Sequence, residues 1–129
     1  METGLRNRPV VLLVDDYEPE RDLYELVLNH ELDIVTASRG EEAVTTASEI
    51  HPDAIVLDVM MPDIDGWTVC ERLKRNARTR SVPIIMLTSM DDENLSGRAR
   101  EAGAVAALLK PCSGDRLLEV IRTAINWPA

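Results

Sequence analysis

Four short aliphatic runs in this chain each end at a polar residue that can handle a phosphate group. Asp15 and Asp16 follow the first run, Asp58 the second, Thr88 the third and Lys110 the fourth. Carboxylates bind hard cations or act as nucleophiles, a hydroxyl donates hydrogen bonds to phosphoryl oxygens, and an ammonium neutralises their charge. These residue types indicate phosphoryl-transfer chemistry, provided that the fold brings them together.

The runs before these residues predict β-strands. They are rich in β-branched residues and lack polar alternation, a pattern typical of strands that are buried on both faces. The runs are Val10–Val14, Ala54–Leu57, Ile84–Leu87 and Val105–Leu109. A fifth strand is expected at Asp33–Ala37, which is the most polar of the set and is therefore placed at an edge of the sheet.

Five segments between and after these strands have the apolar spacing of helices. Pro19 is expected to open the first, Ser38 and Glu41 to form a capping box for the second, and Ser113 to cap the last. The fourth, at about residues 92–102, contains Gly97 and is expected to be the least stable. The side chains expected on the buried faces of the five helices are Leu23, Leu26 and Val27; Ala43, Val44, Ala47 and Ile50; Val69, Cys70 and Leu73; Leu95, Ala99 and Ala102; and Leu117, Leu118, Ile121, Ala124 and Ile125.

This alternation of strands and helices predicts an α/β fold. We expect a flavodoxin-like, doubly wound, five-stranded parallel sheet in the order 2-1-3-4-5, with five helices. All strands would point their C-terminal ends to one edge, so the polar residues would collect at the crevice between the first and third strands. We expect residues 1–129 to form a single domain, with its core at about residues 9–126 and no effector domain.

Composition narrows the functional classes. The chain has 129 residues, 14 basic and 23 acidic, which gives a net charge of −9 and argues against direct binding of nucleic acid. No apolar stretch approaches the roughly 20 residues that span a bilayer, and no signal peptide is evident, so we expect a cytoplasmic protein without membrane insertion. Cys70 and Cys112 lack metal-binding spacing and are expected to be reduced thiols.

The acidic residues predict a divalent cation. Three carboxylates from Asp15, Asp16 and Asp58 within about 4 to 6 Å would repel one another by up to roughly 4 kcal/mol per close pair. A hard cation with oxygen ligands, Mg²⁺ or Mn²⁺, would offset that repulsion. Asp58 could then attack phosphorus, while Lys110 and Thr88 stabilise the transferring group.

At this point the motifs resemble a known family. The stretches 11–16, 58–66 (from Asp58 to Gly66), 87–89 and Lys110-Pro111 are similar to the response-regulator receiver domain of two-component signalling. The resemblance implies that Asp58 is the phospho-acceptor and that Asp16 and Asp58 ligate Mg²⁺ directly. It also implies that Asp15 acts on the metal mainly through water and that the Met60 carbonyl binds the metal. Thr88, Ser89 and Lys110 would contact the phosphoryl group, and the Lys110–Pro111 peptide bond would be cis.

The same resemblance implies partners and a switch. The phosphoryl donor would be a sensor histidine kinase or a histidine phosphotransfer protein, and the receiver would be a signalling switch that catalyses only its own phosphorylation and dephosphorylation. Phosphorylation would shift the loop after the fourth strand and the surface of the fourth helix, fifth strand and last helix. That surface would bind a downstream protein target or form a phosphorylation-dependent homodimer. Ala107 stands where the family commonly has Tyr or Phe, so an aromatic switch is not available in this chain.

Two other functions fit the same fold class. One is a receiver-like binding or scaffold module that is not phosphorylated, against which the complete acidic set, Thr88 and Lys110 argue. The other is a Mg²⁺-dependent phosphohydrolase of the haloacid-dehalogenase kind. That class expects acids at positions i and i+2 after the first strand, whereas Asp15 and Asp16 are adjacent.

Overall fold

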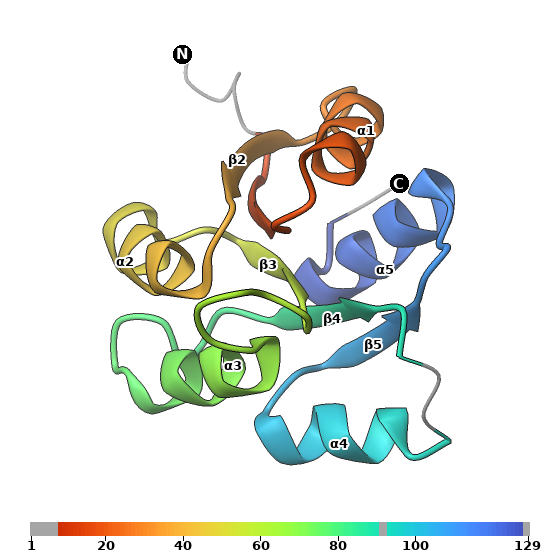
Figure 1. Ribbon diagram of the computed structural model, residues 1–129. Coiled ribbons are helices and arrows are strands. Elements are labelled where there is room, and N and C mark those ends of the chain that lie inside the picture. Colours follow the sequence, from red (N-terminus) through yellow and green to blue (C-terminus); the bar gives the residue numbers. More distant parts are fainter. Residues whose placement is uncertain (1–7, 91–92, 128–129) are drawn as a thin grey trace.

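The aliphatic runs form one parallel sheet (Figure 1). The computed structural model describes residues 8–90 and 93–127. Its strands are β1 (Val10–Val14), β2 (Asp33–Ala37), β3 (Ala54–Asp58), β4 (Ile84–Thr88) and β5 (Ala106–Leu109). They lie in the order β2-β1-β3-β4-β5, and every neighbouring pair is parallel. The predicted fold class and strand order are confirmed, with β2 at an edge as expected.

Helices cover both faces of the sheet. They are α1 (Glu18–Leu28), α2 (Gly40–Ile50), α3 (Gly66–Arg75), α4 (Leu95–Ala102) and α5 (Gly114–Ile125). α1 and α5 lie on one face, and α2, α3 and α4 lie on the other (Figure 1). Among the described residues, no helix is both long enough and apolar enough to cross a bilayer.

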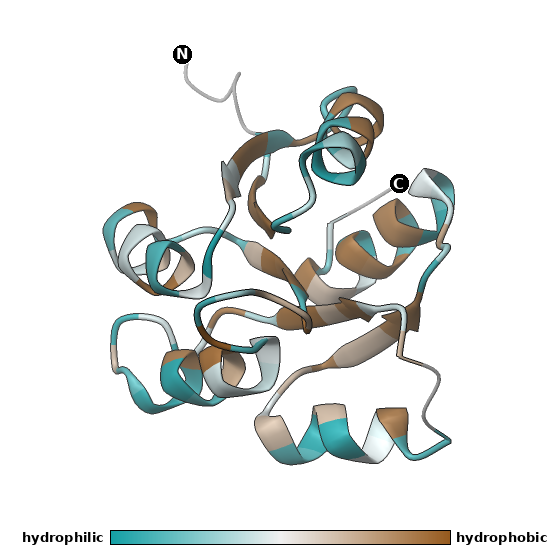
Figure 2. Cartoon of the chain, viewed as in Figure 1, coloured by the Kyte–Doolittle hydropathy of each residue, from teal (hydrophilic) through white to brown (hydrophobic). Residues whose placement is uncertain are grey.

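The central strands are apolar on both sides because each face packs against helices (Figure 2). In β1, Val11 and Leu13 belong to the core under α1 and α5, whereas Leu12 and Val14 belong to the core under α2, α3 and α4. All four are at most 1% exposed. Burying each such side chain stabilises the fold by about 1.5 to 3 kcal/mol relative to exposure.

The buried face of α1 differs from the prediction. Leu23 and Leu26 are 59% and 67% exposed, whereas Tyr24 and Leu28 are buried. The Tyr24 ring packs in the core under α1 and α5, and its hydroxyl donates a hydrogen bond of 2.9 Å to the Cys112 carbonyl. Tyr24 buries a large apolar surface, and its polar group has a hydrogen-bond partner. The face of α1 that carries Tyr24 is therefore the buried one, and the two leucines are exposed to solvent.

The start of α2 also differs from the prediction. The Ser38–Glu41 capping box is not formed, because Ser38 donates to the Glu42 carboxylate instead. The helix is capped from outside by Asp63, whose carboxylate accepts the backbone N–H groups of Gly40 and Glu41 at 2.9 Å each. At the other end of α2, Ile50 is 36% exposed rather than buried.

The last third of the chain follows the prediction in part. Ser113 caps α5 by accepting the Arg116 N–H at 3.1 Å, as expected. The run Val105–Leu109 was expected to be buried on both faces, and that expectation is wrong, because Val105, just before β5, and Leu109 are 59% and 43% exposed. Within the described part of the chain, β5 is an edge strand and pairs only with β4. α4 begins at Leu95, later than predicted, and Asp92 lies outside the described residues.

Candidate functional site

The polar residues that end the strands meet at one rim of the sheet. Asp15 follows β1, and its N–H continues the ladder to β2 by donating to the Ala37 carbonyl at 3.1 Å. Asp58 is the last residue of β3, the other neighbour of β1. Lys110 follows β5 and donates its N–H to the Thr88 carbonyl at the end of β4 at 2.7 Å. The rim therefore lies at the crevice where the winding of the sheet reverses.

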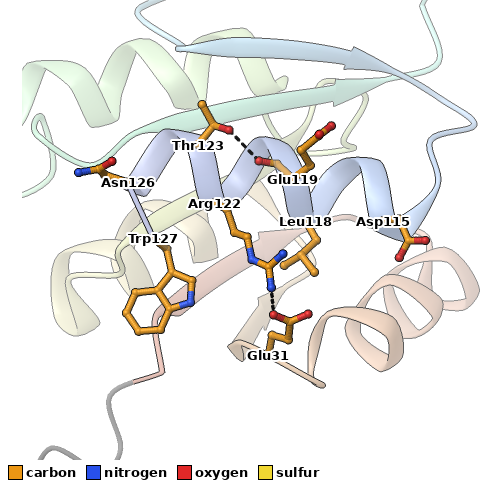
Figure 3. Close-up of a pocket in the computed structure, with 8 residues that line it drawn as sticks. All are labelled: Glu31, Asp115, Leu118, Glu119, Arg122, Thr123, Asn126 and Trp127. Carbon is orange, nitrogen blue, oxygen red and sulfur yellow. Dashed lines mark hydrogen bonds and ion pairs between the residues drawn. The ribbon is translucent and has the colours of Figure 1, made fainter. Parts of the chain in front are cut away.

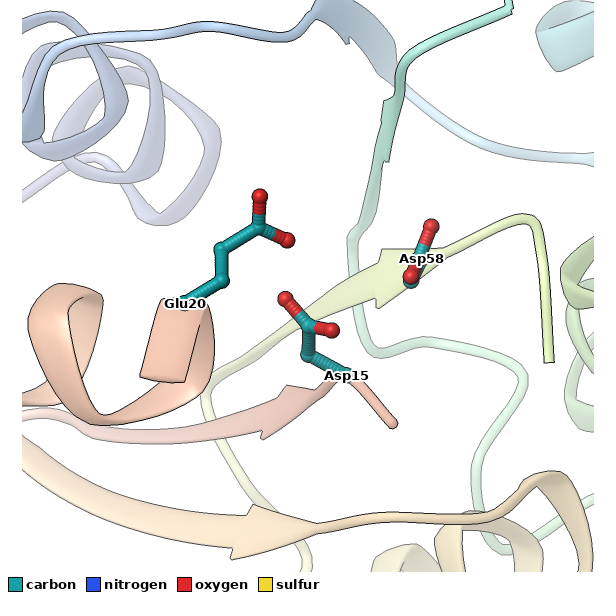
Figure 4. Close-up of side chains that lie close together, drawn as sticks. All are labelled: Asp15, Glu20 and Asp58. Carbon is teal, nitrogen blue, oxygen red and sulfur yellow. The ribbon is translucent and has the colours of Figure 1, made fainter. Parts of the chain in front are cut away.

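Three carboxylates converge there. Asp15, Glu20 and Asp58 each contribute an oxygen atom, and these atoms all lie within 4.8 Å of one another. Figure 4 shows Glu20 in the first turn of α1 reaching toward Asp15, with Asp58 beside them at the tip of β3. Asp15 and Asp58 are 1% and 6% exposed, so their charges lie in a largely desolvated place. Glu20 was not predicted from the sequence, because a glutamate in a first helical turn is usually a solvated residue.

Lys110 supplies the positive charge of this centre. Its Nζ lies 2.5 Å from Glu20 Oε1, 3.4 Å from Asp58 Oδ2 and 3.8 Å from Asp15 Oδ2. Its side chain is 12% exposed, which holds the ammonium among these acids. The Lys110–Pro111 peptide bond is cis.

The charges shift the acidities of the group. Burial raises the pKa of Asp15 to about 7, and the neighbouring Glu20 carboxyl adds to the rise. Burial also raises the pKa of Asp58, against the opposing charge of Lys110. Burial alone would raise the pKa of Glu20, but hydrogen bonds with Asp15 and Lys110 lower it. The pKa of Lys110 is raised despite burial, since its hydrogen bond to Glu20 and the charge of Asp58 favour the ammonium form.

The remaining predicted residues lie around this group. Asp16 is exposed and is not one of the three converging acids, although its charge adds to the raised pKa of Asp58. Met60 is 58% exposed, and its N–H donates to Asp58 Oδ1 at 3.3 Å. Thr88 is fully buried, and its Oγ1 accepts the Met90 N–H at 3.0 Å. Ser89 is exposed next to it.

The donor set fits a hard divalent cation. Asp15 Oδ2 is buried and accepts no hydrogen bond, so a strong acceptor at the rim lacks a donor. Three acids stand around one ammonium, which leaves the centre short of positive charge. Carboxylate oxygens are the ligands that Mg²⁺ and Mn²⁺ prefer. Asp15 and Asp58 could hold such an ion, with Glu20 and Asp16 at its border.

The loop after Asp58 holds the end of β3 close to the start of α3. Gly66, at the start of α3, donates its N–H to the Val59 carbonyl at 2.8 Å. A Cβ at Gly66 would lie 2.2 Å from the Asp58 carbonyl oxygen, so only glycine permits this approach. Asp65 caps α3 by accepting the Thr68 N–H at 2.9 Å, which closes the loop.

A wide hollow elsewhere lacks comparable chemistry (Figure 3). It measures about 870 Å³, runs along α5, and is lined by Glu31, Asp115, Leu118, Glu119, Arg122, Thr123, Asn126 and Trp127. Arg122 forms an ion pair with Glu31 inside it. Among the described residues, the group of acids able to hold a metal ion is at the rim, not in this hollow.

Comparison with known proteins decides the family. A family model for the response regulator receiver domain matches residues 11–122. The chain belongs to the response-regulator receiver family. Response regulator PleD of Caulobacter vibrioides is 38% identical over 118 residues, which cover 91% of this chain and 26% of PleD. Protein PilG of Pseudomonas aeruginosa is 34% identical over 116 residues, which cover 89% of this chain and 86% of PilG.

A solved structure agrees. Chemotaxis protein CheY4 of Vibrio cholerae gives a TM-score of 0.84 at 27% identity and covers 91% of this chain and 98% of that chain. The receiver domain described here is thus a module of two-component signal transduction, and such domains bind Mg²⁺ through an acidic pocket and interact with histidine kinases and downstream targets. The chain spans 26% to 49% of the length of the curated relatives that it matches first.

Proposed function

We propose that Asp58 accepts a phosphoryl group from the phosphohistidine of a sensor histidine kinase or histidine phosphotransfer protein, in the cytoplasm and with Mg²⁺ or Mn²⁺. The observation that carries the proposal is the convergence of Asp58 with Lys110 and a second buried acid at the crevice. Few purely structural sites would place two acids and an ammonium out of water at three different strand ends.

The reaction is a displacement at phosphorus. A carboxylate oxygen of Asp58 attacks as the P–N bond of phosphohistidine breaks, and the imidazole leaves with the electron pair of that bond. Met60 N–H holds Asp58 Oδ1, which leaves Oδ2 facing Lys110. The bound cation would neutralise charge on the transferring oxygens, with Asp15, Asp16, Asp58 and the Met60 carbonyl as its proposed protein ligands.

Lys110, Thr88 and Ser89 are proposed to bind the product phosphoryl group. The Lys110 ammonium is 3.4 Å from Asp58 Oδ2 and would move onto the new oxygens. The Thr88 hydroxyl oxygen accepts the Met90 N–H, and a hydroxyl that accepts can also donate, so its O–H could donate to a phosphoryl oxygen. Ser89 is exposed beside it and could add its hydroxyl or N–H to the phosphoryl oxygens.

We further propose that phosphorylation is read on the surface of α4, β5 and α5, by a downstream protein or by a second phosphorylated copy. Exposed Leu109 on β5 and exposed Val105 just before it give this surface apolar groups to bury. Sedimentation velocity with and without acetyl phosphate would test the homodimer. A single monomer peak in both conditions would remove it and leave a downstream protein as the reader.

Intact mass spectrometry after treatment with acetyl phosphate and Mg²⁺ tests the acceptor. The wild type should gain one phosphoryl group, Asp58→Asn none, and the surface control Asp22→Asn as much as the wild type. EDTA should abolish the gain. A wild type that stays unmodified would favour the binding module that works without phosphorylation, and an Asp58→Asn variant that still gains mass would place the acceptor elsewhere.

A further inference from the structure

Glu20 is the residue at the rim that the proposed phosphoryl transfer does not require. It lies in the first turn of α1, and its side chain is 26% exposed. Its Oε1 lies 2.5 Å from Lys110 Nζ, closer than the oxygens of Asp58 and Asp15, which lie at 3.4 and 3.8 Å. In this state the ammonium is therefore bound mainly to Glu20 and only secondarily to the acceptor.

The same carboxylate also belongs to the group that faces a cation. An oxygen of Glu20 lies within 4.8 Å of oxygens from Asp15 and Asp58. Asp15 Oδ2 points into this group, is buried, and accepts no hydrogen bond. Glu20 thus adds negative charge where a cation would be attracted, and it adds the same charge beside the place where a phosphoryl group would arrive.

We propose that Glu20 is a positioning residue that holds the Lys110 ammonium while the phosphoryl site is empty and competes with phosphoryl oxygens for it. This inference rests on the proposed function. When Asp58 takes up the phosphoryl group, the Lys110 ammonium must leave Glu20 for the phosphoryl oxygens. Glu20 itself forms and breaks no covalent bond. Glu20 therefore opposes phosphorylation by holding Lys110 and favours cation binding through its charge.

Removing the Glu20 charge should weaken cation binding but make phosphorylation easier. A residue with a purely structural role would weaken both when it is replaced. Glu20→Gln keeps the shape and removes the charge. Removing one charge at this distance in partly solvated surroundings changes each equilibrium by about fivefold. The affinity for Mg²⁺, measured by calorimetry on the unphosphorylated protein, should fall by about fivefold. At saturating Mg²⁺, phosphorylation should become easier. The acetyl phosphate concentration for half-maximal uptake should fall by about fivefold, and the maximal rate should change little.

Matched variants complete the test. Glu18→Gln removes an exposed carboxylate from the same helical turn and should change neither quantity. Glu20→Asp restores the charge on a shorter side chain and should recover Mg²⁺ affinity in part. Glu20→Ala should repeat the signs of Glu20→Gln, and thermal unfolding of each variant shows whether it is folded.

Two results would overturn the inference. One is a Glu20→Gln variant that matches the wild type in both quantities, and the other is a variant in which cation affinity and phosphoryl uptake both weaken, as a loosened site would produce. Failure of the proposed function is distinguishable from either. In that case the wild type itself takes up no phosphoryl group, while the calorimetric comparison of Mg²⁺ binding still reports on Glu20.

Discussion

Replacing Asp15 by Asn should stabilise the protein, and increasingly so as the pH rises. Burial raises the pKa of Asp15 from 3.8 to about 7, with the Glu20 carboxyl as a further cause. The unfolded chain releases this proton near pH 4, whereas the folded chain keeps it until about pH 7. Because the folded pKa is the higher one, the stabilising contribution of neutral Asp15 is complete below about pH 4 and is lost as the pH rises through about 7.

The size of the effect follows from that shift. Between pH 5 and pH 7 the wild type loses roughly 3 kcal/mol of stability, since each pH unit removes about 1.36 kcal/mol, and little more is lost by pH 8. Asn cannot ionise, its amide can donate to an acidic neighbour, and its carbonyl oxygen can accept the Tyr17 N–H as Asp15 Oδ1 does at 2.9 Å. The stability of the variant relative to the wild type should therefore increase by up to roughly 3 kcal/mol between pH 5 and pH 8.

Urea unfolding at pH 5, 6, 7 and 8 with EDTA and constant ionic strength measures this difference. Asp22→Asn makes the same chemical change on the exposed side of α1 and should show no such trend. If the advantage of Asp15→Asn over the wild type is the same at all four pH values, burial of an ionisable Asp15 does not limit the stability of this fold, and the reasoning fails.

Two further substitution and labelling experiments test the packing around the site. Gly66→Ala should lower the free energy of unfolding by about 1 to 3 kcal/mol and slow phosphoryl uptake, because its Cβ would meet backbone atoms of Asp58 and Val59 at 2.2 and 2.7 Å. Gly97→Ala is the control and should be neutral or stabilising, because the three atoms nearest its Cβ belong to the Asn94 side chain and not to the backbone. A harmless Gly66→Ala would contradict the close approach. With Ellman's reagent, one of the two cysteines should react in the native protein and both should react in urea. Cys70 is fully buried and its pKa is raised to about 11, whereas Cys112 is partly exposed. Two thiols that react fast in the native protein would show that the core under α3 opens readily.

The layout of the sheet could be predicted from the chain because it depends on local pattern. β-branched runs and helical spacing indicate which segments are strands, and the alternation of strands and helices indicates that the strands run parallel. That alone brought Asp15, Asp58 and Lys110 to one rim. The caps of α3 and α5 are equally local, since Asp65 and Ser113 accept N–H groups three residues further along.

What the sequence could not supply depends on partners that are remote in the chain. Asp63 caps α2 although it lies 22 and 23 residues after the two residues whose N–H groups it accepts, so no local sequence motif indicates this cap. The phase of α1 was set by Tyr24 and its partner Cys112, which lie 88 residues apart. Glu20 lies on that same helix, and its approach to Lys110 spans 90 residues. A glutamate in the first turn of a helix is usually solvated, so without the fold nothing in the sequence places Glu20 beside Lys110.

The loosely packed region between α4 and β5 suggests how a change at the rim could reach the surface despite Ala107. α4 buries only the small side chains of Ala99 and Ala102, so the free energy that docks it against the sheet is small. A cavity of about 110 Å³ lies between α4 and β5 where Ala107 contributes to the lining. Arg98 lies 4.7 Å from the ring centre of Trp67, which ties α4 to α3. We propose that a modest gain of contacts at Thr88 would shift α4 into the free volume, because little packing would have to be broken and no aromatic side chain would have to move first.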